Sequence, residues 1–221
     1  HTKQIFYIEI VLSEPNKPFA RVWLEDGTTR PVSLIRVLGD QFKFYANSDK
    51  KPLPEFFDRQ VRAFGEEIQH VLGSLNIGVV GVGGTGSAVR EQLTRLGVGT
   101  LTVFDGQKFE KTNVNRVYGS HVKDERNKKV DIAERSSDEI GTGTKILKVD
   151  KPITFYTAAA ALRNCDIIFG CTDDNWGRSI LNKIALYYHI PVFDMGVAIN
   201  SKDEIIQSIQ GRVTTLLHGN G

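Results

Sequence analysis

The sequence predicts an α/β protein: a mainly parallel sheet with helices on both faces and an antiparallel extension, preceded by a small β-rich module. Two observations carry this prediction. From residue 76 onward, short apolar runs alternate with amphipathic helical stretches, which is typical of a doubly wound sheet. Before residue 54, short runs of alternating apolar and polar residues are separated by turn signals. We therefore expect a boundary between residues 1–53 and residues 54–221.

Residues 1–53 are expected to form three to five strands. The sequences EPNKP, Asp26-Gly27 and Gly39-Asp40 separate the apolar runs and are typical of turns. The stretch NSDKKPLPE that follows is rich in Pro, Lys and Asp, which is the composition of a linker.

The next segment predicts helices that lead into a strand. Apolar side chains recur at helical spacing between Phe56 and Leu75, with an interruption near Gly65, so we expect one or two helices. The apolar run NIGVV then ends in GVGGTG, a glycine turn that opens an amphipathic helix.

The rest of the chain continues the alternation of strands and helices. The expected strands are TLTVFD, KILKVD, CDIIFGCTD and IPVFDMGV. The expected helices are about residues 127–140, FYTAAAALRN and ILNKIALYYH. The run IQSIQGRVTTLL is expected to extend the sheet as an antiparallel strand.

Composition excludes several classes of partner. The chain has 221 residues, 40% of them hydrophobic, and a formal net charge of +2, which gives no indication of nucleic acid or a membrane surface. No window approaches the roughly 20 apolar residues that span a bilayer. Cys165 and Cys171 have neither a disulfide nor a metal-ligand pattern, which favours a reducing, cytoplasmic compartment.

The glycine turn predicts a nucleotide site. Its glycines, which let the backbone approach a phosphate at a helix N-terminus, are Gly81, Gly83, Gly84 and Gly86. Asp105 closes the next strand about 20 residues on, where a carboxylate accepts hydrogen bonds from ribose hydroxyls. Together, the glycine turn and Asp105 favour a site for an adenine nucleotide. The alternative is a glycine turn that serves only close packing of the strand against the helix. These two features fit NAD as well as ATP.

Three polar clusters after predicted strands favour ATP. They are Asn113 to Arg116, Lys128-Lys129, and Cys171 to Asn175. Attack on an α-phosphate needs cations around a triphosphate and a carboxylate for Mg²⁺, and Arg116, Lys129 and Asp173 supply that set.

Neighbouring residues have ordinary structural interpretations. We expect Lys128 to face solvent and Asp174 to cap a helix. Trp176 is expected to pack, and Arg178 to pair with a nearby carboxylate.

In order, these motifs resemble those of the ThiF/MoeB/HesA adenylyltransferases, the nucleotide-binding half of ubiquitin-activating enzymes. The matching segments are FDRQVRAFGEE, GVGGTG, VFDGQKFEKTNVNR, NKKVD and GCTDDNWGR, within about residues 56–221. The resemblance implies a Rossmann-like fold that uses ATP and Mg²⁺. It also implies adenylation of the C-terminal carboxylate of a ubiquitin-like or sulfur-carrier protein that ends in Gly-Gly.

The resemblance further implies a role for each matching residue. The implied ligands are Asp105 for the ribose, Asn113, Arg116 and Lys129 for the phosphates, and Asp173 for Mg²⁺. Arg59 would act on the γ-phosphate side of the neighbouring subunit's site, which implies a homodimer. No general base is needed, because the attacking carboxylate is already ionised.

The chain departs from the family pattern at its cysteines. Many members carry two C-x-x-C pairs for structural zinc, and thioester-forming members carry a catalytic cysteine; this chain has neither. RVTTLLHGNG ends about where the first pair would begin, so we expect the C-terminus to be missing. Burial in an apolar strand should raise the pKa of the Cys171 thiol, and we predict adenylation without a thioester.

Residues 1–53 loosely resemble the closing strands of a JAB/MPN-type isopeptidase domain, which is found fused to adenylyltransferases of this kind. They lack an H-x-H motif, so we expect no zinc site in them. A small docking or dimerisation module is the favoured interpretation.

Two other functions fit part of the pattern. An NAD(P)-dependent oxidoreductase would account for GVGGTG and Asp105. A non-catalytic nucleotide-binding scaffold would account for a chain without the C-terminal functional elements. Adenylation accounts for all five ordered motifs.

Overall fold

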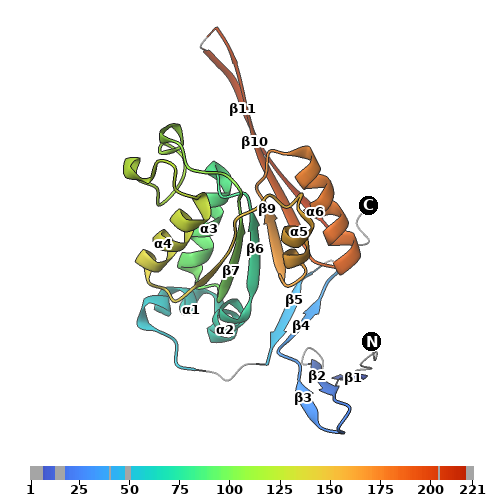
Figure 1. Cartoon of the computed structure of the whole chain (residues 1–221). Helices are drawn as coiled ribbons and strands as arrows, with labels where there is room; N and C mark the ends of the chain where they lie inside the picture. The colour runs from blue at the N-terminus through green and yellow to red at the C-terminus, as the bar shows by residue number, and fades with distance from the viewer. Residues whose placement is uncertain (1–6, 13–17, 40, 48–50, 204, 218–221) are drawn as a thin grey trace. The chain divides into compact units, whose positions relative to one another are not determined.

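The computed structural model describes residues 7–12, 18–39, 41–47, 51–203 and 205–217 (Figure 1). The chain forms two compact units, residues 1–74 and residues 75–221. Residues 54–74, which we expected to belong to the nucleotide-binding domain, fall in the first unit. The functional boundary near residue 53 stays a prediction.

The first unit combines short antiparallel strands with two helices. Its strands are β1 (Tyr7–Leu12), β2 (Pro18–Trp23), β3 (Thr29–Pro31), β4 (Leu34–Val37) and β5 (Lys43–Ala46). Strands β1, β2 and β3 make one sheet, and β4 pairs with β5. Helices α1 (Asp58–Phe64) and α2 (Glu66–Ser74) meet at Gly65, whose φ of +88° ends the first helix where the sequence predicted an interruption.

The second unit is built on a six-stranded sheet with the order β11-β10-β9-β6-β7-β8. The strands are β6 (Asn76–Val80), β7 (Thr100–Phe104), β8 (Lys145–Val149), β9 (Ile167–Gly170), β10 (Val192–Lys202) and β11 (Ile205–Leu216). Neighbouring strands are parallel except for β11, which is antiparallel to β10. The predicted mainly parallel sheet with an antiparallel extension is confirmed.

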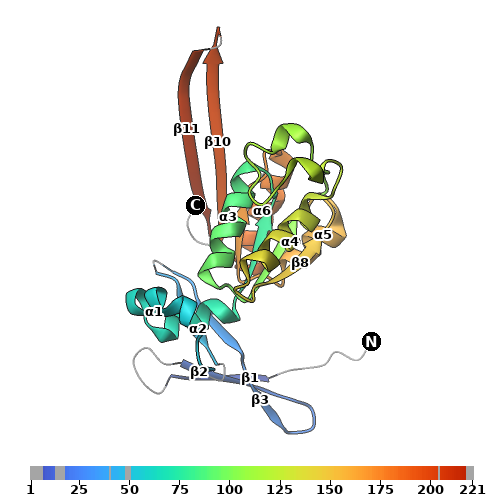
Figure 2. The same ribbon diagram turned by 90° about the vertical axis from the view of Figure 1, so that its left-hand side faces the viewer.

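Helices cover both faces of this sheet (Figure 1). Helices α3 (Gly84–Leu96) and α4 (Lys129–Ile140) lie on one face, and α5 (Tyr156–Leu162) and α6 (Asn175–Tyr188) lie on the other. The main buried cluster lies on the α5 and α6 side and includes Val80, Phe104, Leu162, Ile168, Leu181 and Val192. Figure 2 shows β10 and β11 extending as a hairpin beyond these helices. Within the described ranges, no helix has the length and apolar character to cross a bilayer.

The glycine turn between β6 and α3 is packed too closely for side chains. A Cβ at Gly86 would lie 1.7 Å from the carbonyl oxygen of Gly81, and a Cβ at Gly81 would lie 2.9 Å from the carbonyl oxygen of Cys171. Gly81 also has a φ of +84°, which L side chains rarely adopt. Glycine at these two positions therefore lets α3 begin directly against the ends of β6 and β9.

The long segment between β7 and α4 is held by buried polar contacts. Asp124 accepts hydrogen bonds from the Arg135 guanidinium of α4 at 2.6 and 2.9 Å. This pairing holds the pKa of the Asp124 carboxyl down at about 2. The fully buried Arg90 of α3 donates from Nη2 to the carbonyl oxygen of Tyr118 at 3.0 Å, and Ser87 Oγ accepts from the Tyr118 amide at 3.0 Å. The segment is thus fastened to both helices on its side of the sheet.

The packing of the glycine turn yields a stability prediction. Gly86→Ala should lower the free energy of unfolding by about 2 kcal/mol or more, because the added methyl group meets backbone that cannot move aside. Gly83→Ala is the matched control: an added Cβ there has open space and an ordinary φ of −74°, so its effect should stay below about 1 kcal/mol, the cost of alanine at a helix N-cap. Denaturant unfolding of both variants measures the difference, and equal stabilities would contradict the packing account.

Candidate functional site

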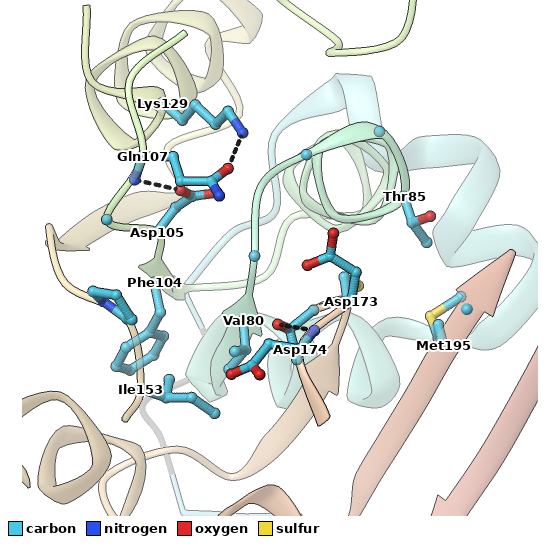
Figure 3. Close-up of a pocket in the computed structure, with 18 of the residues that line it drawn as sticks. Val80, Thr85, Phe104, Asp105, Gln107, Lys129, Ile153, Asp173, Asp174 and Met195 are labelled. Atoms are coloured by element: carbon cyan, nitrogen blue, oxygen red, sulfur yellow. Dashed lines mark hydrogen bonds between the residues drawn. The ribbon is translucent and has the colours of Figure 1, made fainter. Parts of the chain in front are cut away.

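A pocket of about 980 Å³ lies at the carboxyl edge of the sheet in the second unit (Figure 3). The chain runs from β6 to β7 and β8 on one side, and places β9 and β10 on the other. The carboxyl ends of β6 and β9 therefore border the position where the strand order reverses, which is where doubly wound folds bind ligands.

Most of the predicted site residues line this one pocket. They are Gly81, Gly83, Gly84, Asp105, Asn113, Arg116, Lys129 and Asp173. Gly86 does not line it and lies behind the turn, against Gly81. Arg59 is an exposed residue of α1 in the first unit, so its predicted role in the site is not tested by the pocket.

Asp105 connects the glycine turn to the next loop. Its Oδ2 accepts a hydrogen bond from the Val82 amide at 3.0 Å, and its Oδ1 accepts one from the Gln107 amide at 2.8 Å. The side chain is almost buried, yet it lines the pocket. Each carboxylate oxygen has a second lone pair, so Asp105 can accept a hydroxyl from a ligand while it still holds the turn.

Lys129 is placed by a residue that the sequence analysis did not identify. Its ammonium Nζ donates to Gln107 Oε1 at 2.7 Å, and Figure 3 shows both side chains beside Asp105. Lys129 is buried, whereas Lys128 is half exposed and pairs with Asp150, so the predicted exposure of Lys128 to solvent is confirmed. The role of Lys129 as a phosphate ligand stays a prediction. Gln107 follows Asp105 by two residues. No sequence motif indicates that it pairs with Lys129, so this contact could not be predicted from the sequence.

Arg116 and Asn113 come from the segment between β7 and α4. Arg116 packs its aliphatic stem on Gly84, where a Cβ would lie 3.4 Å from the arginine Cδ, and donates from Nη1 to the Thr112 carbonyl oxygen at 2.7 Å. Asn113 is buried, and its Oδ1 accepts from the Glu110 amide at 3.3 Å. The guanidinium is therefore held next to the first turn of α3, whose N-terminal amides attract anions.

The two aspartates after β9 differ in what they contact. Asp174 caps α6 as predicted, accepting from the amides of Trp176 at 3.1 Å and Gly177 at 2.9 Å. The Asp173 carboxylate makes no hydrogen bond or ion pair in the described part of the chain and lines the pocket. Among all the residues that the structure describes, no group of three or more His, Cys, Asp or Glu is placed to hold a metal by itself.

Cys171 lies just past the end of β9 and lines the pocket with intermediate exposure. Burial, with a smaller contribution from the nearby Asp194 carboxylate, raises the pKa of its thiol to about 12. The expected upward shift is confirmed, although the residue borders the pocket instead of lying inside the strand.

The β10 side of the pocket was missed by the sequence analysis. Arg178, Met195, Gly196 and Val197 all line it. Arg178 pairs with Asp194, as expected of it, and faces the pocket as well. Trp176 was expected to pack and is instead 76% exposed, so that prediction was wrong.

This arrangement has the chemistry of a site for a polyphosphate nucleotide. It combines a glycine turn at a helix N-terminus and an aspartate beside that turn with the cations of Arg116 and Lys129 and the unpaired carboxylate of Asp173. A nucleotide bound with a divalent metal needs both kinds of group, because the cations attract its phosphates and the carboxylate can bind the metal.

The sequence is similar to curated proteins over part of its length. It is 30% identical over 148 residues to ubiquitin-like modifier-activating enzyme 5 of Culex quinquefasciatus, covering 61% of this chain and 37% of that protein. It is 27% identical over 114 residues to the adenylyltransferase and sulfurtransferase UBA4 of Meyerozyma guilliermondii, covering 52% of this chain and 27% of that protein. The chain thus spans well under half the length of these relatives.

Solved structures share the fold of about two thirds or more of the chain. E. coli MccB with ATP matches with a TM-score of 0.62 at 17% identity, over 76% of this chain and 50% of MccB. At that identity the likeness shows the fold alone. The sequence profile of the ThiF family matches residues 57–221, which is most of the chain. The chain therefore belongs to the ThiF family.

Proposed function

We propose that this protein adenylates the C-terminal carboxylate of a ubiquitin-like or sulfur-carrier protein, using ATP. The observation that carries the proposal is the pocket itself, in which a ThiF-family chain gathers Asp105, Arg116, Lys129 and Asp173 around one glycine turn. The names of the curated relatives, a modifier-activating enzyme and an adenylyltransferase, support this class of reaction. E. coli TcdA, a tRNA N6-threonylcarbamoyladenosine dehydratase, shares the fold, so the acceptor must be tested directly.

The nucleotide is proposed to lie across the carboxyl ends of β7 and β6. Asp105, at the end of β7, accepts hydrogen bonds from the ribose hydroxyls. The phosphates lie on the glycine turn and the N-terminus of α3, where backbone amides point toward an anion. NAD would use the same two features, but two cations and a free carboxylate suit a triphosphate better.

The cations are proposed to serve the leaving pyrophosphate. Arg116 and Lys129 both belong to the segment that follows β7, and Asn113 adds an amide group to the same wall of the pocket. Gln107 holds the Lys129 ammonium at 2.7 Å, which fixes its position before ATP binds. A cation that is already in position loses little side-chain freedom when the negative charge develops, and this favours the reaction.

Asp173 is the proposed magnesium ligand. Mg²⁺ usually takes one or two carboxylates and completes its shell with phosphate oxygens and water, so a single unpaired aspartate in the pocket fits the ion. When bound, Mg²⁺ neutralises charge on the phosphates and orients them. The acceptor carboxylate is ionised at neutral pH, so the protein need not supply a base.

The proposal places the enzyme in the cytoplasm and in a homodimer. The described cysteines, Cys165 and Cys171, are both free thiols, which suits a reducing compartment. The dimer is proposed because FDRQVRAFGEE resembles the family segment that reaches into the neighbouring subunit's ATP site. The exposed Arg59 of this segment would contact the γ-phosphate of ATP bound to the partner subunit.

The first test is ATP–pyrophosphate exchange with Mg²⁺ and candidate carriers that end in Gly-Gly. Wild type should catalyse carrier-dependent exchange, and Asp173→Ala should reduce it by roughly 100-fold or more, because the metal loses its protein ligand. Asp174→Asn is the matched control, since it neutralises the neighbouring carboxylate that caps α6. ATP binding without exchange by any carrier would favour a scaffold, and bound NAD would favour an oxidoreductase.

Mixed subunits test whether Arg59 acts in trans. Arg59→Ala and Asp173→Ala should each be inactive alone. A one-to-one mixture should recover about a quarter of wild-type exchange, because half of the dimers are mixed and each keeps one intact site. Absence of recovery, with mixed dimers verified by two affinity tags, would show that Arg59 acts within its own subunit or not at all.

The Cys171 thiol should be unreactive near neutral pH. With a pKa of about 12, its alkylation by iodoacetamide should rise about tenfold per pH unit up to pH 10, whereas an ordinary thiol levels off near 8.5. Mass spectrometry of the Cys171 peptide follows this rate. A carrier adduct that is released by reductant and is absent from Cys171→Ser would contradict the prediction that adenylation proceeds without a thioester.

A further inference from the structure

The pocket contains a cation on its β10 side that the proposed nucleotide site does not use. Arg178, near the start of α6, lines the pocket on the β10 side. Its Nε lies 3.4 Å from Oδ1 of the buried Asp194, and Arg212 Nη2 lies 2.6 Å from Oδ2 of the same aspartate. Two guanidinium groups thus share one carboxylate, which leaves a net charge of about +1 at this end of the site.

Arg178 has donors available for a ligand. No hydrogen bond from its guanidinium is formed to any residue that the structure describes, and Nε is buried without an acceptor in hydrogen-bond geometry. Its Nη2 lies beside Gly196, where an added Cβ would approach it to 3.2 Å. Glycine at 196 therefore leaves the forked face of the guanidinium uncovered. A planar fork of this kind matches the two oxygens of a carboxylate.

The sheet separates Arg178 from the cations proposed for the pyrophosphate. Along the sheet, β7 leads into Asp105, β6 leads into the glycine turn, β9 precedes Asp173, and β10 contains Asp194. Figure 3 shows the same order, with Lys129 and Asp105 at one end of the pocket, Asp173 between, and Met195 at the other end. Lys129 is therefore on the β7 side, Arg116 lies beside the glycine turn that follows β6, and Arg178 is on the β10 side.

Displacement at the α-phosphorus requires the attacking and leaving oxygens to lie roughly in line. If the pyrophosphate lies with Arg116 and Lys129, the attacking carboxylate must approach from the opposite direction. Arg178 is the pocket cation on that side.

An exposed apolar strip on the β10–β11 hairpin begins at the pocket. Met195 and Val197 line the pocket, and the strand register places Ile199, Ile209 and Val213 on the same face of the β10–β11 hairpin. Val197, Ile199, Ile209 and Val213 are each exposed by 59–64%. These side chains lie on the opposite face of β10 from Asp194 and Gly196, which lie beside Arg178, because successive side chains of a strand alternate. The apolar strip therefore leads outward from the pocket along the hairpin that extends from the sheet in Figures 1 and 2.

We propose that Arg178 binds the C-terminal carboxylate of the acceptor polypeptide and directs it at the α-phosphate. The inference rests on the adenylation proposed above. In the step, a carboxylate oxygen forms a bond to the α-phosphorus, the bond from that phosphorus to the bridging oxygen breaks, and pyrophosphate leaves with the electron pair. No proton is transferred. Asp194 holds the guanidinium in place.

The test compares two peptides that end in Gly-Gly, one with a free carboxylate and one with a C-terminal amide. Binding is measured with Mg²⁺ and α,β-methylene-ATP present. Wild type should bind the acid roughly tenfold or more tightly than the amide, since a hydrogen bond to a charged group is lost in the amide. Arg178→Met should bind the two peptides alike, and Arg178→Lys should show an intermediate preference.

Arg212→Met is the matched control, because it also removes a guanidinium from Asp194 but does not line the pocket. It should keep the preference for the acid. Affinity for α,β-methylene-ATP without peptide should be unchanged in Arg178→Met. Thermal unfolding of both variants measures how much stability the protein loses when one guanidinium is removed from Asp194.

Three results would overturn the inference: a preference for the acid that survives in Arg178→Met, equal binding of both peptides by wild type, or weaker nucleotide binding with the preference intact. The last would assign Arg178 to the phosphates. Exchange activity separates this inference from the proposed function. Carrier-dependent exchange that Asp173→Ala abolishes and Arg178→Met leaves intact would support adenylation and reject the role of Arg178.

Discussion

The packing of Gly86 against the carbonyl oxygen of Gly81 is the contact on which the site depends. An added Cβ would lie 1.7 Å from that oxygen, so the helix could not begin where it does with any side chain there. Because α3 starts against the turn, its first amides face the pocket, and Gly84 lies where the stem of Arg116 can pack. The phosphate-binding geometry is thus set by backbone contacts, before any charged side chain is considered.

Asp105 joins this turn to the rest of the pocket. Its two carboxylate oxygens accept from the amides of Val82 and Gln107, which fixes the glycine turn relative to the loop after β7. Gln107 in turn holds the Lys129 ammonium. One buried carboxylate therefore connects the turn and a cation, and a substitution at Asp105 would disturb the fold of the site together with any contact to a ribose.

Charge is distributed unevenly across the sheet. Arg116 and Lys129 follow β7, whereas Arg178 lies beside β10 and shares Asp194 with Arg212. An adenylating enzyme must bind two anions, a polyphosphate and an acceptor carboxylate. Cations at opposite ends of the pocket would bind these two anions at separate positions. The sheet order makes this separation possible, because β9 and β10 lie on the far side of β6 from β7.

Much of this organisation was determined by the sequence alone. The alternation of strands and helices, the glycine turn, the Asp174 cap and the difference between Lys128 and Lys129 depend on local periodicity and backbone chemistry, which short stretches of sequence record. The ordered motifs also indicated the residues that line the pocket.

Only the tertiary structure decided which distant residues meet. Three sets of contacts join residues 16 to 28 positions apart in the chain. They are the pairing of Gln107 with Lys129, the hydrogen bond from Arg90 to the Tyr118 carbonyl, and the sharing of Asp194 by Arg178 and Arg212. Trp176 was misjudged for the same reason, since its exposure depends on which side of α6 meets the sheet. Such contacts follow from the order of strands in the sheet, and local sequence patterns do not encode that order.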